Sequence, residues 1–367
     1  ALAAFSPDAL SSIAYANQEI YLGLIVAGSA GLALSAKIGF AITILLILVT
    51  ISYYQTIHGY PLGGGSYTVA KANLGTLPGL IAASALMIDY ILTAAVSLTA
   101  GIEAIASAFP FLWDHKVLAS LVLLLIIMLA NLRGLRETGT LMSVPVYFFL
   151  IVYLPMLAIG ICRLIVEGPS PIGASVLEVA QPLTTFLIIH AFSTGCTALT
   201  GIEAISNGVP AFKPPEAKNA GITLLVVGSL MGILFLGSIG LTQYLGVISG
   251  PRETILSALA RRVVGVGPYY YLVQISTMLI LAVAANTSFA GFPRVAAILA
   301  RDGFLPRQLM GLGDRLVFSN GIIALALVSG LLIVVFHGDT HSLIPLFAVG
   351  AFLAFTLSQT GMVIHWW

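Results

Sequence analysis

The sequence has very few charged residues. Aspartate, glutamate, lysine and arginine together make up 8% of the 367 residues, whereas hydrophobic residues make up 59%. Because about a quarter of the residues in an ordinary soluble domain are charged, this composition excludes a water-soluble surface. The formal net charge is +1 and the basic residues are dispersed. A nucleic-acid-binding protein is therefore excluded, since it needs concentrated positive charge.

Cysteine is almost absent as well. Cys162 and Cys196 both fall in apolar stretches, which argues against a disulfide framework and against a thiolate metal site. We interpret both as small, buried packing residues. The sequence also lacks a nucleophile elbow, a metal-binding histidine spacing and a nucleotide-binding fingerprint. It therefore predicts neither an enzyme nor a cofactor.

The two ends of the sequence are typical of part of a longer chain. The first residues, Phe5 to Asp8, are polar and helix-breaking, unlike the basic and apolar start of a signal peptide. The sequence ends at Trp367, immediately after an apolar span. We expect the natural protein to extend beyond both ends.

Hydrophobic residues occur in repeated blocks about 20 residues long, the length that crosses a bilayer as a helix. Windows of about 19 residues predict ten spans and hence an all-α, multi-pass protein embedded in the lipid bilayer. These spans lie near residues 9–29, 36–57, 76–108, 116–133, 141–166, 183–209, 219–248, 268–299, 319–337 and 341–365.

Lysine and arginine residues predict the orientation of the chain. With a cytoplasmic N-terminus, nine of them lie on the cytoplasmic side and six lie outside. This bias strengthens if segment 251–267 forms an amphipathic helix on the external side. The nine cytoplasmic residues are Lys71, Arg133, Arg136, Lys213, Lys218, Arg294, Arg301, Arg307 and Arg315.

Ten spans divide into two sets of five, residues 1–166 and 183–367. The run Ala9 to Ile13 weakly resembles the run Ala198 to Ile202, and each follows a Phe-Ser pair. Spans 1 and 6 are also interrupted by proline, glycine, serine and threonine, which predicts broken helices around a site near the middle of the bilayer. The alternative is that these residues make ordinary kinks and helix contacts. Their clustering at equivalent positions favours a site.

Acidic residues inside apolar spans mark candidate functional positions, because each costs about 2.5–3.5 kcal/mol on insertion scales. Asp89 lies centrally in span 3, and Thr93 and Ser97 follow at four-residue intervals. This spacing places a carboxyl and two hydroxyls on one helical face. Glu103, near the end of the span, is expected to reach interfacial water. Glu19 is expected to serve an external gate or to face an aqueous vestibule.

Oxygen-bearing residues on spans 1, 3 and 6 predict a cation site. Hard cations bind carboxylates, hydroxyls and carbonyls, and broken helices expose carbonyls. Asp8 and Asp89 supply negative charge, or are protonated and hydrogen-bonded to hydroxyls; a proton-coupled transporter alternates between these states. Glu203 either couples protons or hydrogen-bonds the unwound backbone. The predicted ligands are Asp8, Tyr15, Asp89, Thr93, Ser97 and Thr200.

Two connections have simpler structural interpretations. The glycine-rich segment Tyr60 to Tyr67 lacks the Lys-Ser or Lys-Thr of a phosphate-binding loop. We expect a tight cytoplasmic turn that allows helices to approach closely. In the later connection, Arg294, Arg301, Asp302 and Arg307 are expected to anchor a cytoplasmic loop.

Seven sequence runs resemble the amino acid, polyamine and organocation superfamily and, within it, the potassium-uptake permease family. They cover nearly the whole chain in order. The resemblance implies an all-α membrane protein with the LeuT-like five-plus-five inverted repeat and broken helices 1 and 6. The runs are SPDALSSIAYA, YPLGGGSYTVAKANLG, MIDYILTAAVS, NLRGLRETG, CTALTGIEAISNGVPAF, AANTSFAGFPRVAAILARDGFLP and LIPLFAVGAFLAFTLSQTGM.

The resemblance implies a secondary active transporter that imports potassium with protons by alternating access, in a bacterial inner membrane with the N-terminus cytoplasmic. Potassium is the substrate, and Glu203 is the proton-coupling candidate. Relatives also carry two further spans and a cytoplasmic domain that responds to cyclic di-AMP and supports a homodimer. The implied ion path is lined by Asp8, Tyr15, Asp89, Thr93, Ser97 and Thr200, with potassium on Asp8, Asp89, Thr93 and Thr200.

Two observations bear on the substrate. Phe347 stands in span 10 where the resemblance implies a tyrosine, which removes one expected hydroxyl from the ion path. The main alternative is an amino acid or amine permease of the same superfamily. Such permeases hold a carboxylate on a glycine-rich break, whereas Asp8 repels a carboxylate and attracts a cation. A channel is disfavoured, because no repeated selectivity-loop sequence is present.

Overall fold

The computed structural model describes residues 6–61, 63, 65–134, 139–170, 179–311 and 318–367, and these ranges contain helices and no strand. The helices in chain order are α2 (Pro7–Ser11), α3 (Ile13–Ile25), α4 (Gly28–Leu32), α5 (Ser35–Gly59), α6 (Ser66–Leu74), α7 (Thr76–Ala108), η1 (Pro110–His115), α8 (Lys116–Leu132), α9 (Gly139–Glu167), α10 (Thr185–Gly195), η2 (Cys196–Leu199), α11 (Glu203–Asn207), η3 (Val209–Ala211), α12 (Glu216–Tyr244), α13 (Ile255–Val264), α14 (Pro268–Arg301), η4 (Arg307–Leu309), α15 (Ser319–Val335) and α16 (Thr340–Trp366).

Eight helical segments in the described part of the chain are long and apolar enough to cross a membrane. The other two predicted spans are also helical but shorter, because α15 has 17 residues and span 1 is divided into α2 and α3. Large apolar side chains are exposed on the outer helices: Ile151 is 69% exposed, Leu327 68% and Val349 70%. Lipid tolerates such a surface and water does not. The chain is therefore a multi-pass membrane protein.

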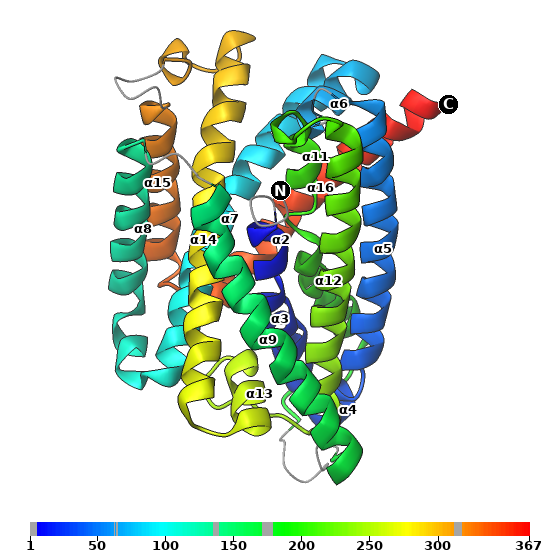
Figure 1. The fold of residues 1–367 in the computed structure, drawn as a ribbon, viewed down its shortest axis with the longest axis vertical. Helices are drawn as coiled ribbons and strands as arrows, with labels where there is room; N and C mark the ends of the chain where they lie inside the picture. Colours follow the sequence, from blue (N-terminus) through cyan, green and yellow to red (C-terminus); the bar gives the residue numbers. More distant parts are fainter. Residues whose placement is uncertain (1–5, 62, 64, 135–138, 171–178, 312–317) are drawn as a thin grey trace.

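The long helices run roughly along one axis and enclose the two short helices at the start of the chain (Figure 1). α2 lies near the middle of this axis and contacts α12 and α14, and α7 packs along α14 and α16. α8 and α15 pair at one edge, and α5 and α12 pair at the other. Polar residues on α2 are consequently buried at mid-height.

The two ends of the bundle differ. α6 and α11 lie at one end and α4 and α13 at the other (Figure 1). α13 is the amphipathic helix predicted in segment 251–267: it buries Ile255, Leu259 and Val263, and its last turn holds Arg261 and Arg262. A basic residue near a helix C-terminus is favoured by the helix dipole.

The short helix α6 anchors the end of α14. Nζ of Lys71 lies 2.6 Å from Oδ2 of Asp302, and the Tyr67 hydroxyl donates to the same oxygen at 2.5 Å. These bonds lower the pKa of Asp302 below its ordinary value. The prediction that Asp302 anchors a loop is confirmed, whereas α6 itself was not predicted.

The two cysteines differ in burial. Cys196 is buried as predicted, but Cys162 is exposed on α9. The prediction for Cys162 was wrong, because an apolar stretch in a membrane protein faces lipid as readily as protein. Arg136 and Arg315, counted toward the orientation, lie outside the described residues.

Candidate functional site

The second broken helix is interrupted between η2 and α11. The chain is extended at Thr200, with φ −67° and ψ 152°, and Gly201 has a φ of +86°. Only glycine adopts this left-handed conformation without strain. The predicted break in span 6 is therefore confirmed at Thr200 and Gly201, and helical hydrogen bonding stops there.

The first predicted break is much milder. Pro7 occupies the first turn of α2, where its fixed φ favours helix formation. Between α2 and α3 only Ser12 interrupts the helix, and its backbone stays helical, with φ −59° and ψ −25°. Pro7 was predicted to break the helix; in the structure it begins one, because its missing N–H is not needed there.

The two interrupted helices touch each other directly. A Cβ atom on Gly201 would lie 2.4 Å from the backbone nitrogen of Ala9 and 2.7 Å from the carbonyl carbon of Asp8. The Ser12 hydroxyl also donates to the carbonyl oxygen of Ala198 across 3.2 Å. The absence of a side chain at Gly201 thus allows the break in span 6 to pack against the start of α2, beside Asp8.

Three buried carboxyls gather around this contact. Asp8, Asp89 and Glu203 are each at most 5% exposed. Glu203 lies within range of electrostatic repulsion by both aspartates. One oxygen of each carboxyl has no hydrogen-bond partner among the described residues. No lysine, arginine or histidine in the described ranges forms an ion pair with any of the three.

The carboxyls do not form a chelating cluster. In the part of the chain that the structure describes, no three His, Cys, Asp or Glu residues are close enough together to hold a metal ion. A cation held here would therefore be bound by one or two carboxyls together with neutral oxygens. Such a ligand set suits a weakly hydrated monovalent cation better than a tightly held divalent cation.

Neutral oxygens lie next to the break. The Tyr15 hydroxyl is 3.4 Å from Oγ1 of Thr200, which in turn donates to the carbonyl of Thr197 at 2.8 Å. Phe347 packs edge-on against Tyr15, with ring centroids 6.2 Å apart. The structure thus brings together the predicted ligands Tyr15 and Thr200. The Phe347 ring, which carries no hydroxyl, packs against Tyr15.

The predicted stripe on α7 is buried along its whole length. Asp89, Thr93 and Ser97 are 3%, 2% and 1% exposed. The Ser97 hydroxyl has no partner among the described residues. The backbone of Asp89 lies against Gly350 of α16, where a Cβ atom would come within 3.5 Å of the Asp89 nitrogen. The stripe therefore faces protein and not lipid.

Glu203 turns back toward the break. Its carboxyl interacts with the backbone amides of Gly201 and of Glu203 itself. This contact fits the alternative in which Glu203 hydrogen-bonds the unwound backbone. Its proximity to Asp8 leaves proton coupling as a prediction, because two neighbouring buried carboxyls favour sharing a proton.

Two further acidic residues lie toward the α13 end. Glu103 was expected to reach interfacial water; it is 8% exposed and lines a cavity at the α13 end. Its Oε1 lies 3.5 Å from Nζ of Lys116 and accepts from the backbone nitrogen of Thr340 at 3.3 Å. Glu19 is also buried, and its Oε2 lies 2.8 Å from Nδ1 of His341. Sequence patterns did not predict the pairing of Lys116 or His341, since their partners are 13 and 322 residues away.

Comparison with known proteins agrees with this architecture. The family model described as Amino acid permease matches residues 8–367. Potassium transporter KimA of Bacillus subtilis (strain 168) is 48% identical over 369 aligned residues, which cover all of this chain and 61% of KimA. The chain thus spans about 61% of the length of that relative.

A second relative is more distant. Cationic amino acid transporter 3, mitochondrial, of Arabidopsis thaliana is 26% identical over 171 residues, or 46% of this chain and 27% of the relative. Both relatives are transporters by name, and the family match extends over almost all of the described helices. The chain therefore belongs to the amino acid permease family of membrane transporters.

Proposed function

We propose that this chain imports potassium by alternating access, coupled to protons. The relative named as a potassium transporter supports the choice of ion. The observation that carries the proposal is the group of three buried carboxyls beside the broken helices, without an ion pair among the described residues. Buried charges are costly unless they are neutralised. A cation substrate supplies that neutralisation.

The number of carboxyls supports proton coupling. One monovalent cation balances one of the charges on Asp8, Asp89 and Glu203, so the remaining carboxyls are protonated for most of the cycle. Release of the cation leaves a charge that a proton can replace. Inward movement of a monovalent cation is also driven by the membrane potential, by about 2.3 kcal/mol per 100 mV.

The neutral ligands of this proposal come from three helices. Tyr15 and Thr200 are already 3.4 Å apart at the break, and Thr93 and Ser97 extend the path along α7. Potassium would bind Asp8, Asp89, Thr93 and Thr200, and the break would add backbone carbonyls. Flexible rings of carbonyl and hydroxyl oxygens replace the hydration shell of potassium at little cost.

Alternating access would use a LeuT-like pair of five-helix repeats, residues 1–166 and 183–367. The interruptions at Ser12 and at Thr200 and Gly201 lie in the first helix of each proposed repeat. Rocking one set of helices against the other would expose the site to each side in turn. The proposed setting is a bacterial inner membrane with a cytoplasmic N-terminus, and homodimer formation and cyclic di-AMP regulation would involve regions outside this sequence.

A second candidate function is uptake of an amine or a cationic amino acid. The relative named as a cationic amino acid transporter favours it. Buried carboxyls would hold an ammonium group as well as a metal cation. The acidic side chain of Asp8 beside the break disfavours a substrate carboxylate at that position.

Rubidium uptake into proteoliposomes tests the proposal. We expect an inward proton gradient to accelerate uptake, and unlabelled potassium to compete for it. A parallel panel of lysine, arginine and simple amines distinguishes the second candidate. Amine uptake without rubidium flux would reject potassium as the substrate.

A further inference from the structure

A cavity of about 330 Å³ opens at the α13 end of the bundle. We call it the vestibule. Its wall includes three acidic side chains, Glu103, Glu253 and Asp339. Other residues in its wall are Gln18, Thr254, Thr340 and His341.

A second, smaller cavity leads from the vestibule toward the candidate site. Its volume is about 20 Å³, which is room for about one water molecule. Tyr15 lines this inner cavity, together with four residues that also line the vestibule. Those shared residues are Gln18, Glu103, Thr254 and Thr340. The two cavities thus mark a route to Tyr15, and Glu103 lines both of them.

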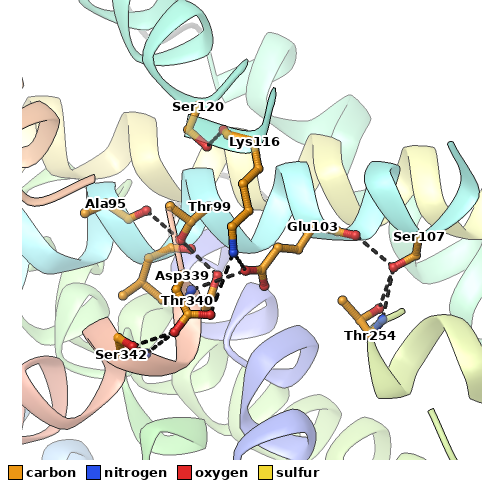
Figure 2. A network of polar contacts seen from close by, with 11 residues as sticks. Ala95, Thr99, Glu103, Ser107, Lys116, Ser120, Thr254, Asp339, Thr340 and Ser342 are labelled. Atoms are coloured by element: carbon orange, nitrogen blue, oxygen red, sulfur yellow. Dashed lines mark hydrogen bonds and ion pairs between the residues drawn. The ribbon is translucent and has the colours of Figure 1, made fainter. Parts of the chain in front are cut away.

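An ammonium group pairs with carboxylates of this route, although Lys116 itself is in the wall of neither cavity. Figure 2 shows Lys116 reaching from the start of α8 to Glu103 on α7 and Asp339 before α16. Nζ is 3.5 Å from Oε1 of Glu103 and 3.8 Å from Oδ1 of Asp339. It also lies 5.5 Å from the centroid of the Trp113 ring. The Lys116 side chain is 19% exposed, so solvent screens these contacts only in part.

The other charges around the vestibule have different partners. Glu253 pairs with Arg261 at 2.7 Å, and Glu19 pairs with His341 at 2.8 Å. Among the described residues, Lys116 is the basic residue that forms ion pairs with Glu103 and with Asp339. A cation that moves toward Tyr15 passes these two carboxylates and competes with the lysine for them.

We propose that the Lys116 ammonium is a tethered cation that closes the access route at Glu103 and Asp339, and that an incoming cation displaces it. Lys116 is thereby a positioning residue that controls access to the site. The identity of the displacing ion rests on the proposed function. The role of Lys116 at these carboxylates does not, because it is argued from its ion pairs with two residues of the vestibule wall.

The rate of thiol modification measures closure without any transport. The variant Cys162→Ser retains only the buried Cys196 and serves as the unlabelled background. Ala104→Cys in this background places a thiol in the wall of the inner cavity. Purified protein in proteoliposomes is treated with a cationic, membrane-impermeant methanethiosulfonate, and mass spectrometry follows the modification.

We expect Lys116→Gln to accelerate modification at Ala104→Cys by about fivefold, the effect of losing an ion pair worth about 1 kcal/mol. Lys116→Arg keeps the charge and should stay near the parent rate. Asp339→Asn removes one carboxylate partner of Lys116, retains an oxygen to cap α16, and should give an intermediate modification rate. This variant replaces Lys116→Gln in the test if Lys116→Gln fails to fold. Arg262→Gln is the matched control, because it removes the ion pair with Glu167 away from the vestibule.

Equal modification rates in the parent and in both charge-removing variants would overturn the proposal, because Lys116 would then be a structural ion pair only. Potassium chloride in place of choline chloride should accelerate modification in the parent and not in Lys116→Gln. Potassium with no effect on the parent would overturn displacement. Rubidium uptake by the same vesicles separates the two proposals: faster modification without flux would reject potassium transport and support closure by Lys116.

Discussion

Asp8 and Asp89 place two carboxyls inside membrane helices near the contact between the broken helices. Asparagine removes the negative charge and nearly preserves the volume. We expect Asp8→Asn and Asp89→Asn each to reduce rubidium uptake by tenfold or more, because a hydrogen bond or ligand contact to a charged group is worth about 1.5–3 kcal/mol. Uptake is normalised to folded protein recovered by size-exclusion chromatography.

Asp114→Asn is the control for these variants, since Asp114 is exposed and pairs with Arg252 at the α13 end. Its uptake should stay within about twofold of the parent, as expected for a surface ion pair. Near-normal uptake by Asp8→Asn or Asp89→Asn would remove that residue from the site.

Gly201 is the residue on which the contact between the broken helices depends. Gly201→Ala adds a methyl group 2.4 Å from the Ala9 nitrogen and strains a φ of +86°. We expect a loss of about 1–3 kcal/mol in stability from backbone strain, seen as a lower Tm in detergent, together with reduced uptake. Gly240→Ala is the control, because nothing lies within 4 Å of its added Cβ atom. An unchanged Tm for Gly201→Ala would show that the two helices separate readily.

At the scale of elements, the link between α6 and the end of α14 gives a pH dependence. Lys71 and Tyr67 lower the pKa of Asp302. Their bonds therefore stabilise the fold above the unfolded-state pKa of about 3.9, and this stabilisation is lost as pH falls through the lower folded-state pKa. We expect Asp302→Asn to reduce the Tm slightly at pH 7, with the difference from the parent shrinking below about pH 4 and disappearing once the pH is below the lowered folded-state pKa. Thermal unfolding at both pH values measures it, and a constant difference would contradict the assignment.

The helices also show which local patterns the sequence specifies. The Gly201 break and the amphipathic helix α13 were predicted correctly, because glycine conformations and hydrophobic periodicity are local properties. The interruption at Ser12 was overestimated. Serine and proline there are compatible with a helix, and contacts with Ala198 decide their geometry.

At the scale of the whole molecule, the orientation in the membrane is testable. The end that holds α13 should be extracellular and the end that holds α6 cytoplasmic, following the basic residues. In the Cys162→Ser background, Asp114→Cys should react with an impermeant maleimide on intact cells. Lys213→Cys should react only after permeabilisation. The reverse pattern would show that the N-terminus is extracellular.

The site was predictable in its residues and not in its arrangement. Asp8, Asp89 and Glu203 stand out because an acidic residue in an apolar span is unusual. Their gathering depends on packing between helices more than 80 residues apart in sequence. Phe347 was identified by resemblance, but only the structure places its ring on Tyr15.

The sequence by itself determined that this protein is a bundle of membrane helices with a break in span 6 and acidic residues at mid-membrane, because hydropathy, glycine and charge act locally. The tertiary structure decided which groups meet. It packed Gly201 against α2, it buried Glu103 against Lys116, and it formed the vestibule on the α13 side of Tyr15. These contacts join distant segments, so only the packed chain specifies them.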